Sequence, residues 1–307
     1  MISADKPLRM RTQLTPALGP AEVGRSGVYR DKALKSLDRL PPLSPLVGRL
    51  LSKLAFRNVN YGELAGLVEK DALLCAHILS AVNSARFARA RTITSVTQAM
   101  SLLGTNTLRR IAVGFTVANL FSKVKPARSW SRIRFNLHSG ATAILAEAIA
   151  RRLPIENEGA FVAGMMHDIG RLLIAVGLPE EYEMVLVLSA MTGAPVVDCE
   201  RERLGTDHAE LSALALLRWG IPGGINQAAH FHHTPDAPGA PTLALVLHRA
   251  DRFVNYLGIT VDAPKPAVSN GDLPEPPSLR IPGFEFDEQE VLREFERDWK
   301  ELAKFFS

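Results

Sequence analysis

The chain has 307 residues, of which 47% are hydrophobic and 22% charged, with a formal net charge of +4 and a pI of about 9.2. This length supports one large domain or two smaller ones, each with its own core. Two cysteines are too few for a disulfide framework, the N-terminus has no secretory signal, and the apolar stretches are too short and interrupted to cross a bilayer. We therefore expect a cytoplasmic protein. Its mild basicity, without a stripe of Lys and Arg, does not indicate nucleic-acid binding.

The first half of the chain has the apolar spacing of helices. Residues 1–31 are polar and punctuated by Pro and Gly, which predicts a flexible leader. Residues 32–126 predict an N-terminal helical block, with helices at 45–55, after Asn60 with Glu63 completing a capping box, and at 71–87, 95–104 and 105–123. Gly104 is placed to end a helix. Alternation with a period of two residues is hard to find, so we expect few strands and an all-α fold.

A break at Lys125-Pro126 begins the second half, where residues 127–260 predict another helical block. Residues 261–284 are rich in proline and predict a connector without a helix. Residues 285–307 predict an amphipathic C-terminal helix with Asp287 as its N-cap. We expect its apolar stripe to dock on the protein's own core, with partner binding as the alternative; the stripe consists of Val291, Leu292, Phe295, Trp299, Leu302 and Phe306.

The stretch "GMMHDIGRLL" places His167 and Asp168 side by side in an otherwise apolar helical run. Burying both side chains is costly unless a partner satisfies them, and neighbouring positions on a helix point in different directions. The pair therefore faces a polar cleft, or a partner that needs nitrogen and oxygen together. The same block carries further groups of this kind, namely His138, His208, His232, His233 and Asp251.

Imidazole and carboxylate are the ligands of Zn, Mn and Fe, and a helical bundle can bring them inward from separate helices. A single histidine on a helix is most often a cap, a surface group or a satisfied core group. We assign His77 to that class, and His230 and His248 also favour it. The ordered series of the other residues is what indicates a metal site.

The order of these residues resembles the HD superfamily of metal-dependent phosphohydrolases, whose pattern is His, then His-Asp, then a final Asp. The additional histidines resemble the HD-GYP branch, which holds two or three ions. The segments "LPPLSPLVGRLLSKL", "LAGLVEKDALLCAHILSAVNSARF", "ITSVTQAMSLLG" and "LRWGIPGGINQAAHFHH" resemble the HDOD domain, an HD-related output module of bacterial signalling proteins. The resemblance covers about residues 34–258. It implies an N-terminal helical block packed on an HD-like helical bundle.

Carried over to this sequence, the resemblance implies a first metal site of His138, His167, Asp168 and Asp251. It implies that Asp168 bridges to a second site completed by His208, His232 and His233. The expected cofactors are one or two divalent transition-metal ions, Fe or Mn first, with Zn or Ni as substitutes. A pair of such ions lowers the pKa of a bridging water to form hydroxide. The residues expected to take part in catalysis are Asp168, which would bridge the ions, and Arg171, whose charge suits a phosphate.

The sequence also departs from the resemblance. The paired histidines are followed by "TPDAPGAP" rather than a Gly-Tyr-Pro turn, and "HDIGR" replaces "HDIGK". Arg134 stands where an acidic residue would support a third ion. We expect an HDOD-type signalling or regulatory module with a structural or ligand-sensing metal site, and a phosphohydrolase acting on a nucleotide or phosphodiester as the alternative. Its partners would be other signalling proteins or a phosphate-containing small molecule, with no membrane; the oligomeric state stays open.

Overall fold

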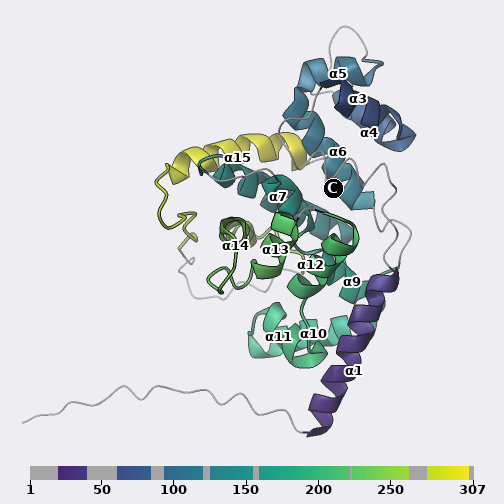
Figure 1. The fold of residues 1–307 in the computed structure, drawn as a ribbon, viewed down its shortest axis with the longest axis vertical. Coiled ribbons are helices and arrows are strands. Elements are labelled where there is room, and N and C mark those ends of the chain that lie inside the picture. Colours follow the sequence, from purple (N-terminus) through teal and green to yellow (C-terminus); the bar gives the residue numbers. More distant parts are fainter. Residues whose placement is uncertain are drawn as a thin grey trace, which may run out of the picture.

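The computed structural model describes residues 20–39, 61–83, 93–119, 125–154, 159–221, 223–262 and 275–303. All regular structure in these ranges is helical, which confirms the predicted fold class (Figure 1). Three predictions lie outside the described residues, namely the helix at 45–55, the cap at Asn60 and the place of Phe306 in the apolar stripe. The boundaries proposed for the separate blocks remain predictions.

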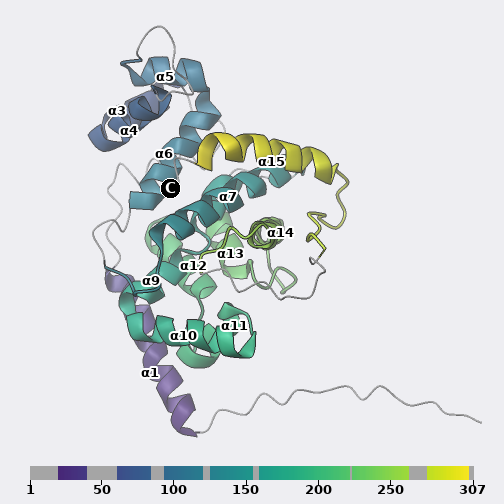
Figure 2. The same cartoon turned by 180° about the vertical axis from the view of Figure 1, so that it is seen from behind.

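Four helices from the first half of the chain, which we call the N-terminal helices, form one end of the molecule. The last of them, α6, contacts the remainder (Figures 1 and 2). They are α3 (Tyr61–Glu69), α4 (Ala72–Val82), α5 (Val96–Leu103) and α6 (Thr105–Asn119). Ser95 caps α5 by accepting a hydrogen bond from the backbone N–H of Gln98 at 3.1 Å. Gly104 ends α5 with a φ of 76°, in the region that glycine adopts without strain, as the sequence predicts.

Helix α7 (Arg132–Ala150) is the centre of the fold. From Ser139 to Ala150 every side chain is buried, because α8, α14 and α15 pack around it and α6 contacts it. A helix that is apolar on all sides is stable only in such an interior position. The helices that complete the bundle are α8 (Ala160–Met166), α9 (Ile169–Gly177), α12 (His208–Arg218), α13 (Gly223–Phe231) and α14 (Thr242–Tyr256).

Judged by length and composition alone, the segment Ala160–Gly177 could cross a membrane. In the structure it is interrupted between α8 and α9, and 89% of it is buried inside the protein. Its hydropathy is therefore explained by its place in the core.

Helix α1 (Pro20–Ser36) differs from the flexible leader predicted over residues 1–31, because residues 20–31 are helical; residues 1–19 lie outside the described residues. Tyr29, Ala33 and Leu37 recur four residues apart and pack into a second core cluster with α9 to α11. Arg30 also forms an ion pair with Glu210 at 2.6 Å. The polar composition concealed this narrow apolar stripe. The neighbouring elements are the 3-10 helix η1 (Leu37–Arg39), α10 (Pro179–Thr192) and α11 (Val196–Leu204).

Helix α15 (Glu288–Leu302) docks on α7, as predicted, and lies along it in Figure 2. Asp287 caps its N-terminus by accepting from the N–H of Gln289 at 2.8 Å. Val291, Phe295 and Leu302 are buried against the core. The interaction with a partner is therefore not needed to explain the apolar stripe.

A buried ion-pair network joins α6, α7 and α15. The carboxylate of Glu147 on α7 is bonded to three guanidinium groups, those of Arg109, Arg110 and Arg151. Arg110 extends the network to Asp298 on α15 at 2.7 Å. Burial alone would raise the pKa of Glu147, but the three arginines hold it at about 2. The N-terminal helices and the C-terminal helix are thus fixed to the same point of α7.

We expect Glu147→Ala to lower the free energy of unfolding by about 3–5 kcal/mol, because it leaves buried guanidinium groups without their counter-ion. The contribution of Glu147 is complete above its unfolded pKa of 4.5 and is lost as the pH falls toward 2. Urea denaturation of both proteins from pH 7 to pH 3 should show the difference shrinking with acid. Asp38→Ala, which breaks an exposed pair with Arg218, is the control and should change stability by less than about 1 kcal/mol. Equal effects of the two substitutions would contradict this assignment.

Candidate metal centre

His167 and Asp168 lie in a break between two helices, which is why two adjacent residues can face one site. Helix α8 ends at Met166 and α9 begins at Ile169, so the apolar run is not the single helix that the sequence suggested. His167 is entirely buried and Asp168 is 3% exposed. At this break both side chains reach the same group of polar residues.

Two glycines let the neighbouring helices approach closely at this break. A methyl group on Gly170 would overlap the backbone carbonyl of His208 at the start of α12. A methyl group on Gly164 would overlap the backbone of Ala143 on α7. The glycine in the "HDIGR" stretch is therefore required by packing, and this contact places His208 beside Asp168.

One group of possible ligands consists of His138, His167 and Asp251, whose ligand atoms all lie within 4.8 Å of one another. His138 Nε2 lies 3.1 Å from Asp251 Oδ1, and His167 Nε2 lies 3.8 Å from the same oxygen. The side chains come from α7, the α8–α9 break and α14. The structure thus brings together three of the four residues expected at the first site.

The other group consists of Asp168, His208, His232 and His233, also with ligand atoms within 4.8 Å of one another. Asp168 Oδ1 lies 3.2 Å from His208 Nε2 and 3.6 Å from His232 Nε2. Asp168 Oδ2 faces the first group, at 3.7 Å from His138 Nε2. Asp168 Oδ1 also lies 3.6 Å from His167 Nε2, so the Asp168 carboxylate lies beside both groups, as a shared ligand would.

Each of three buried imidazoles has one ring nitrogen without a hydrogen-bond partner. The Nδ1 atoms of His138, His167 and His232 lie 2.6–2.8 Å from the backbone carbonyls of Ile259, Gly164 and Ala229. Because a carbonyl only accepts, we assign the proton to Nδ1 in each ring. The corresponding Nε2 atoms are buried and unpartnered, and they point toward carboxylate oxygens. An Nε2 atom that faces a carboxylate is satisfied by a metal ion between the two, or by a second proton on the ring.

Glu200 on α11 supports His208 and was missed from the sequence. Its Oε2 accepts from the backbone N–H of His208 at 2.9 Å and lies 2.5 Å from His208 Nδ1. The stretch "DCERERL" has the mixed charge of a solvated helix face, yet Glu200 is 1% exposed. Nothing in the local pattern distinguishes this residue, because its burial depends on the packing of α11 in the folded protein, where α11 contacts α1 and α10.

The pKa values in the cluster are shifted because buried carboxylates and imidazoles lie close together. Burial alone would lower the pKa of His208, but the carboxylates of Glu200 and Asp168 raise it to about 10. Burial would likewise raise the pKa of Asp168, but the imidazoles of His167 and His208 hold it well below its usual range. The carboxylate is therefore ionised at neutral pH and requires positive charge close by, from a metal ion or from protons on the rings.

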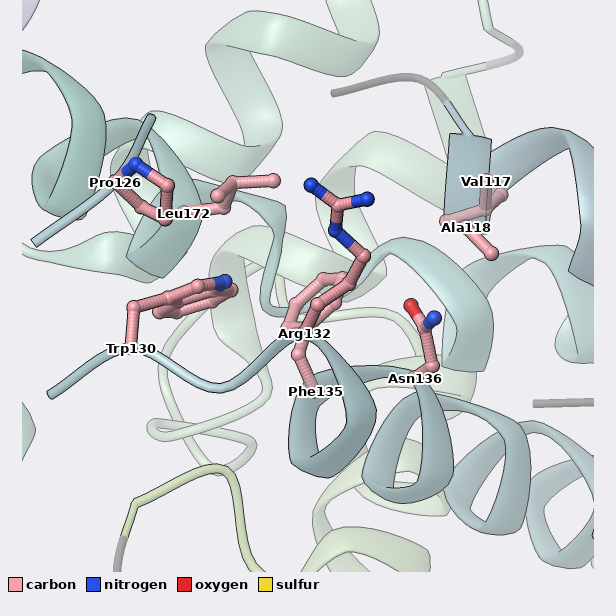
Figure 3. Close-up of a pocket in the computed structure, with 8 residues that line it drawn as sticks. All are labelled: Val117, Ala118, Pro126, Trp130, Arg132, Phe135, Asn136 and Leu172. Carbon is pink, nitrogen blue, oxygen red and sulfur yellow. The ribbon is translucent and has the colours of Figure 1, made fainter. Parts of the chain in front are cut away.

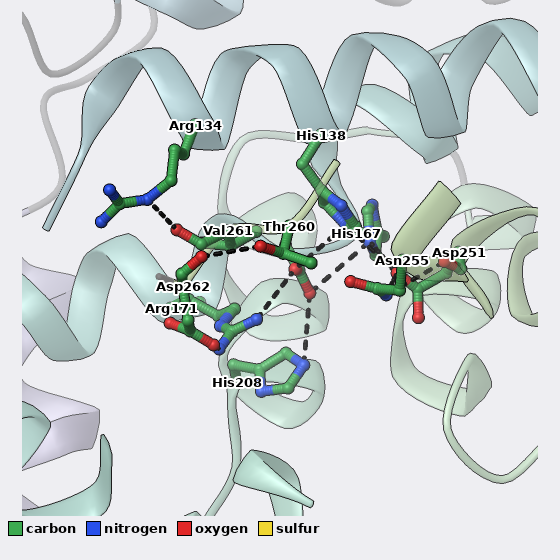
Figure 4. Close-up of polar contacts among 12 residues, drawn as sticks. Arg134, His138, His167, Arg171, His208, Asp251, Asn255, Thr260, Val261 and Asp262 are labelled. Atoms are coloured by element: carbon green, nitrogen blue, oxygen red, sulfur yellow. Dashed lines mark hydrogen bonds and ion pairs between the residues drawn. The ribbon is translucent and has the colours of Figure 1, made fainter. Parts of the chain in front are cut away.

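Arg171 and Arg134 do not extend freely into the site. Arg171 is buried, forms an ion pair with Asp262 and lies 3.6 Å from Asp168 (Figure 4). Arg134 donates to the backbone carbonyls of Val261 at 3.1 Å and Ser129 at 3.0 Å. Both guanidinium groups are thus engaged by the chain itself, which the sequence did not indicate.

The three remaining histidines outside the cluster have other contacts. His77 stacks on the ring of Phe115 with centroids 4.3 Å apart, and His230 packs edge-on against Phe231. His248 Nδ1 lies 2.8 Å from the backbone carbonyl of His232 and so supports the segment that carries two of the candidate ligands.

A small cavity of about 20 Å³ lies at the N-terminal end of α7, beside Trp130 and Asn136 (Figure 3). This space holds about one water molecule. It is too small for a phosphate ester.

The fold and the cluster together define an all-helical domain with a buried His/Asp centre. Residues 40–235, more than half of the chain, match the HDOD domain, and the protein belongs to the HDOD family. This match ends before Asp251 and the segment that follows α14.

Several known proteins are similar to this chain in sequence or fold. An uncharacterized protein of Treponema pallidum (strain Nichols) is 25% identical over 210 residues, which are 66% of this chain and 40% of that relative, so the chain spans less than half of its length. An HDOD domain protein of unknown function from Geobacter sulfurreducens has a TM-score of 0.72 at 24% identity, covering 92% of this chain and 97% of the other. A protein from Shewanella amazonensis SB2B, named as a proposed phosphohydrolase, has a TM-score of 0.67 at 22% identity, covering 90% and 98%.

We expect Gly170→Ala to lower the free energy of unfolding by about 3 kcal/mol, because the added methyl group forces α9 away from α12. Gly66→Ala is the matched control, since α3 leaves open space there and alanine favours a helix by up to about 1 kcal/mol. Thermal and chemical denaturation of the two variants measure the difference. If both substitutions leave stability unchanged, the close approach at Gly170 is not a real constraint.

Proposed function

We propose that the seven clustered side chains hold one or two divalent transition-metal ions within an HDOD signalling domain. The main support is the set of buried, unpartnered Nε2 atoms on His138, His167 and His232. Each ring is oriented by a backbone carbonyl at its Nδ1, the arrangement that metal-binding imidazoles adopt. The donor set fits the proposed ions, with Asp168 shared between the sites. The full set is His138, His167, Asp168, His208, His232, His233 and Asp251.

The ligand chemistry favours Fe or Mn, with Zn or Ni as substitutes. Imidazole suits Zn, Fe and Ni, whereas carboxylate also suits Mn, and a mixed set lies between these preferences. Cysteine takes no part, because neither Cys75 nor Cys199 belongs to the two ligand groups. Availability in the cell then decides which ion is held.

A bound ion of this class polarises a phosphate oxygen and makes water acidic near neutral pH. The protein's own residues contribute orientation and exclusion of water. Glu200 fixes the ring of His208, and the bundle buries Asp168 and His167. These properties are shared by a metal site that binds a phosphate ligand and one that hydrolyses it.

We favour regulation over hydrolysis because of the loop that follows the paired histidines. The loop after the paired histidines is a succession of tight turns, in which Ala237 N–H donates to Thr234 at 3.0 Å and Ala240 N–H donates to Ala237 at 3.0 Å. It presents no aromatic ring for stacking a base. The retained ligand set is the observation that favours the alternative, a phosphohydrolase acting on a nucleotide or phosphodiester.

The proposed partners follow from the family and the site. A signalling domain in the cytoplasm would bind other signalling proteins, and the metal centre would bind a phosphate-containing small molecule. Neither a membrane nor a nucleic acid is needed for this function.

We expect protein purified without added metal to contain one or two transition-metal ions per chain, measured by elemental analysis. Asp168→Ala should remove more metal than any single histidine substitution, because Asp168 faces both groups. His208→Ala should empty about half of the sites. His77→Ala, which lies outside both groups, is the control and should retain the full content. Equal metal in wild type and Asp168→Ala would refute the metal centre.

We expect little or no hydrolysis of cyclic di-GMP by Mn- or Fe-loaded protein. The phosphate must approach within about 3–3.5 Å of the attacking oxygen, and the turn that would position it is replaced by "TPDAPGAP". Turnover should be measured with cyclic di-GMP, nucleotides and simple phosphomonoesters in parallel, with Asp168→Ala as the control. Rapid cleavage that depends on Asp168 would make the hydrolase the better assignment.

A further inference from the structure

The segment after α14 crosses the metal centre and is held there by polar contacts. We call residues 259–262 the strap. Its backbone carbonyls accept from His138 Nδ1 at Ile259 (2.8 Å) and from Arg134 Nε at Val261 (3.1 Å). Within the strap, the hydroxyl of Thr260 donates to the backbone carbonyl of Asp262 at 2.7 Å. Figure 4 shows the strap residues between Arg134 and the cluster.

Asp262, the last residue of the strap, places a carboxylate on the outer side of Arg171. The guanidinium of Arg171 is bonded to Asp262 through one terminal nitrogen, and the other lies 3.6 Å from Asp168 Oδ2. The hydroxyl of Tyr182 also donates to Asp262, at 3.2 Å. Arg171 is thus positioned between the metal ligand Asp168 and an acid supplied by the chain itself.

The groups around Asp262 have the chemistry of an oxyanion site. A guanidinium fork binds phosphate or carboxylate through parallel N–H donors, and a phenol adds a neutral donor. The Nε of Arg171 is buried and has no partner, so the single carboxylate leaves one donor of the fork unused. A phosphate group, with more oxygens and more charge, can satisfy the donors that a carboxylate cannot.

We propose that Arg171 and Tyr182 form a phosphate-binding site beside the metal centre, and that Asp262 occupies it as an internal substitute for the ligand. The inference rests on the proposed function, because the metal centre defines the inner side of the site. A phosphate ester displaces the Asp262 carboxylate, and the strap then moves away from the site together with that carboxylate. Its departure releases the Nε of Arg134 from Val261, which provides a second guanidinium for the ligand.

Several features favour a displaceable carboxylate over a permanent one. The Asp262 side chain is 22% exposed, whereas the Arg171 side chain is 10% exposed and Asp168 is 4% exposed. The receiving groups are therefore built into the core, and the acid reaches them from the surface. Asp262 also lies beyond residues 40–235, the part that matches the family.

The competing explanation is that Asp262 only holds Arg171 in place. The two explanations give opposite results for Asp262→Asn, which removes the charge and keeps the shape. If Asp262 competes with the ligand, the affinity for phosphate rises, because an internal competitor acts at an effective concentration in the millimolar range or above. If Asp262 only positions Arg171, phosphate binding weakens or stays the same.

The test is calorimetric titration with inorganic phosphate of the full chain, both stripped of metal and loaded with Mn. We expect Asp262→Asn to raise the phosphate affinity at least about tenfold in both forms, and Asp262→Asn combined with Arg171→Gln to abolish the gain. Asp38→Asn is the matched control, because it removes a carboxylate from an exposed pair with Arg218 and should leave affinity unchanged. No gain in a folded Asp262→Asn protein would overturn the inference, as would the same gain in the control.

Two further measurements keep the test decisive if Asp262→Asn does not fold. Thr260→Val should loosen the strap and raise phosphate affinity, and saturating phosphate should speed amide hydrogen exchange over residues 259–262 of the wild-type protein. Unchanged affinity and exchange would overturn the inference. Metal content, measured on the same samples, tests the proposed function separately, since the gain in the metal-stripped protein depends on Arg171 and Tyr182 and not on a bound ion.

Discussion

Asp168 carries a negative charge in the interior of the protein, and the surrounding structure is arranged to stabilise it. An isolated buried carboxylate costs several kcal/mol even after the protein relaxes. Here one oxygen faces His208 at 3.2 Å and the other faces His138 at 3.7 Å, so the charge is shared by two groups of imidazoles. Neutral rings cannot balance it. A metal ion, or protons on the rings, must therefore be present in the folded protein, which couples folding, metal binding and pH.

The helices that deliver these side chains are fixed by contacts of different kinds at the two ends of α7. In its N-terminal half, α7 presents His138 to the cluster, and the strap and α14 contact this helix. Nine residues further along, or about 13.5 Å, Glu147 binds the arginines that connect α6 and α15. The helix that carries a candidate metal ligand is thus also the point of attachment for the N-terminal helices and the C-terminal helix. This arrangement explains why α15 is docked by buried ion pairs as well as by apolar side chains.

The sequence predicted those features that depend on local pattern or on an ordered series of residues. Helix spacing predicted the all-α fold, glycine and aspartate predicted the ends of α5 and α15, and the series from His138 to Asp251 predicted the residues that the structure brings together. Features that depend on packing between distant helices were not predictable. Glu200 and Asp262 look like solvated acids in their segments, and the break between α8 and α9 is hidden inside an unbroken apolar run. The stripe of α1 was obscured by its polar neighbours.

The central claim is that this cluster is a metal centre shared through Asp168. Anomalous X-ray diffraction from crystals of protein purified without added metal tests it most directly. We expect anomalous density beside Asp168, with one peak among His138, His167 and Asp251 and a second among His208, His232 and His233. Crystals that show these side chains joined only by hydrogen bonds and water, with no anomalous density, would contradict it.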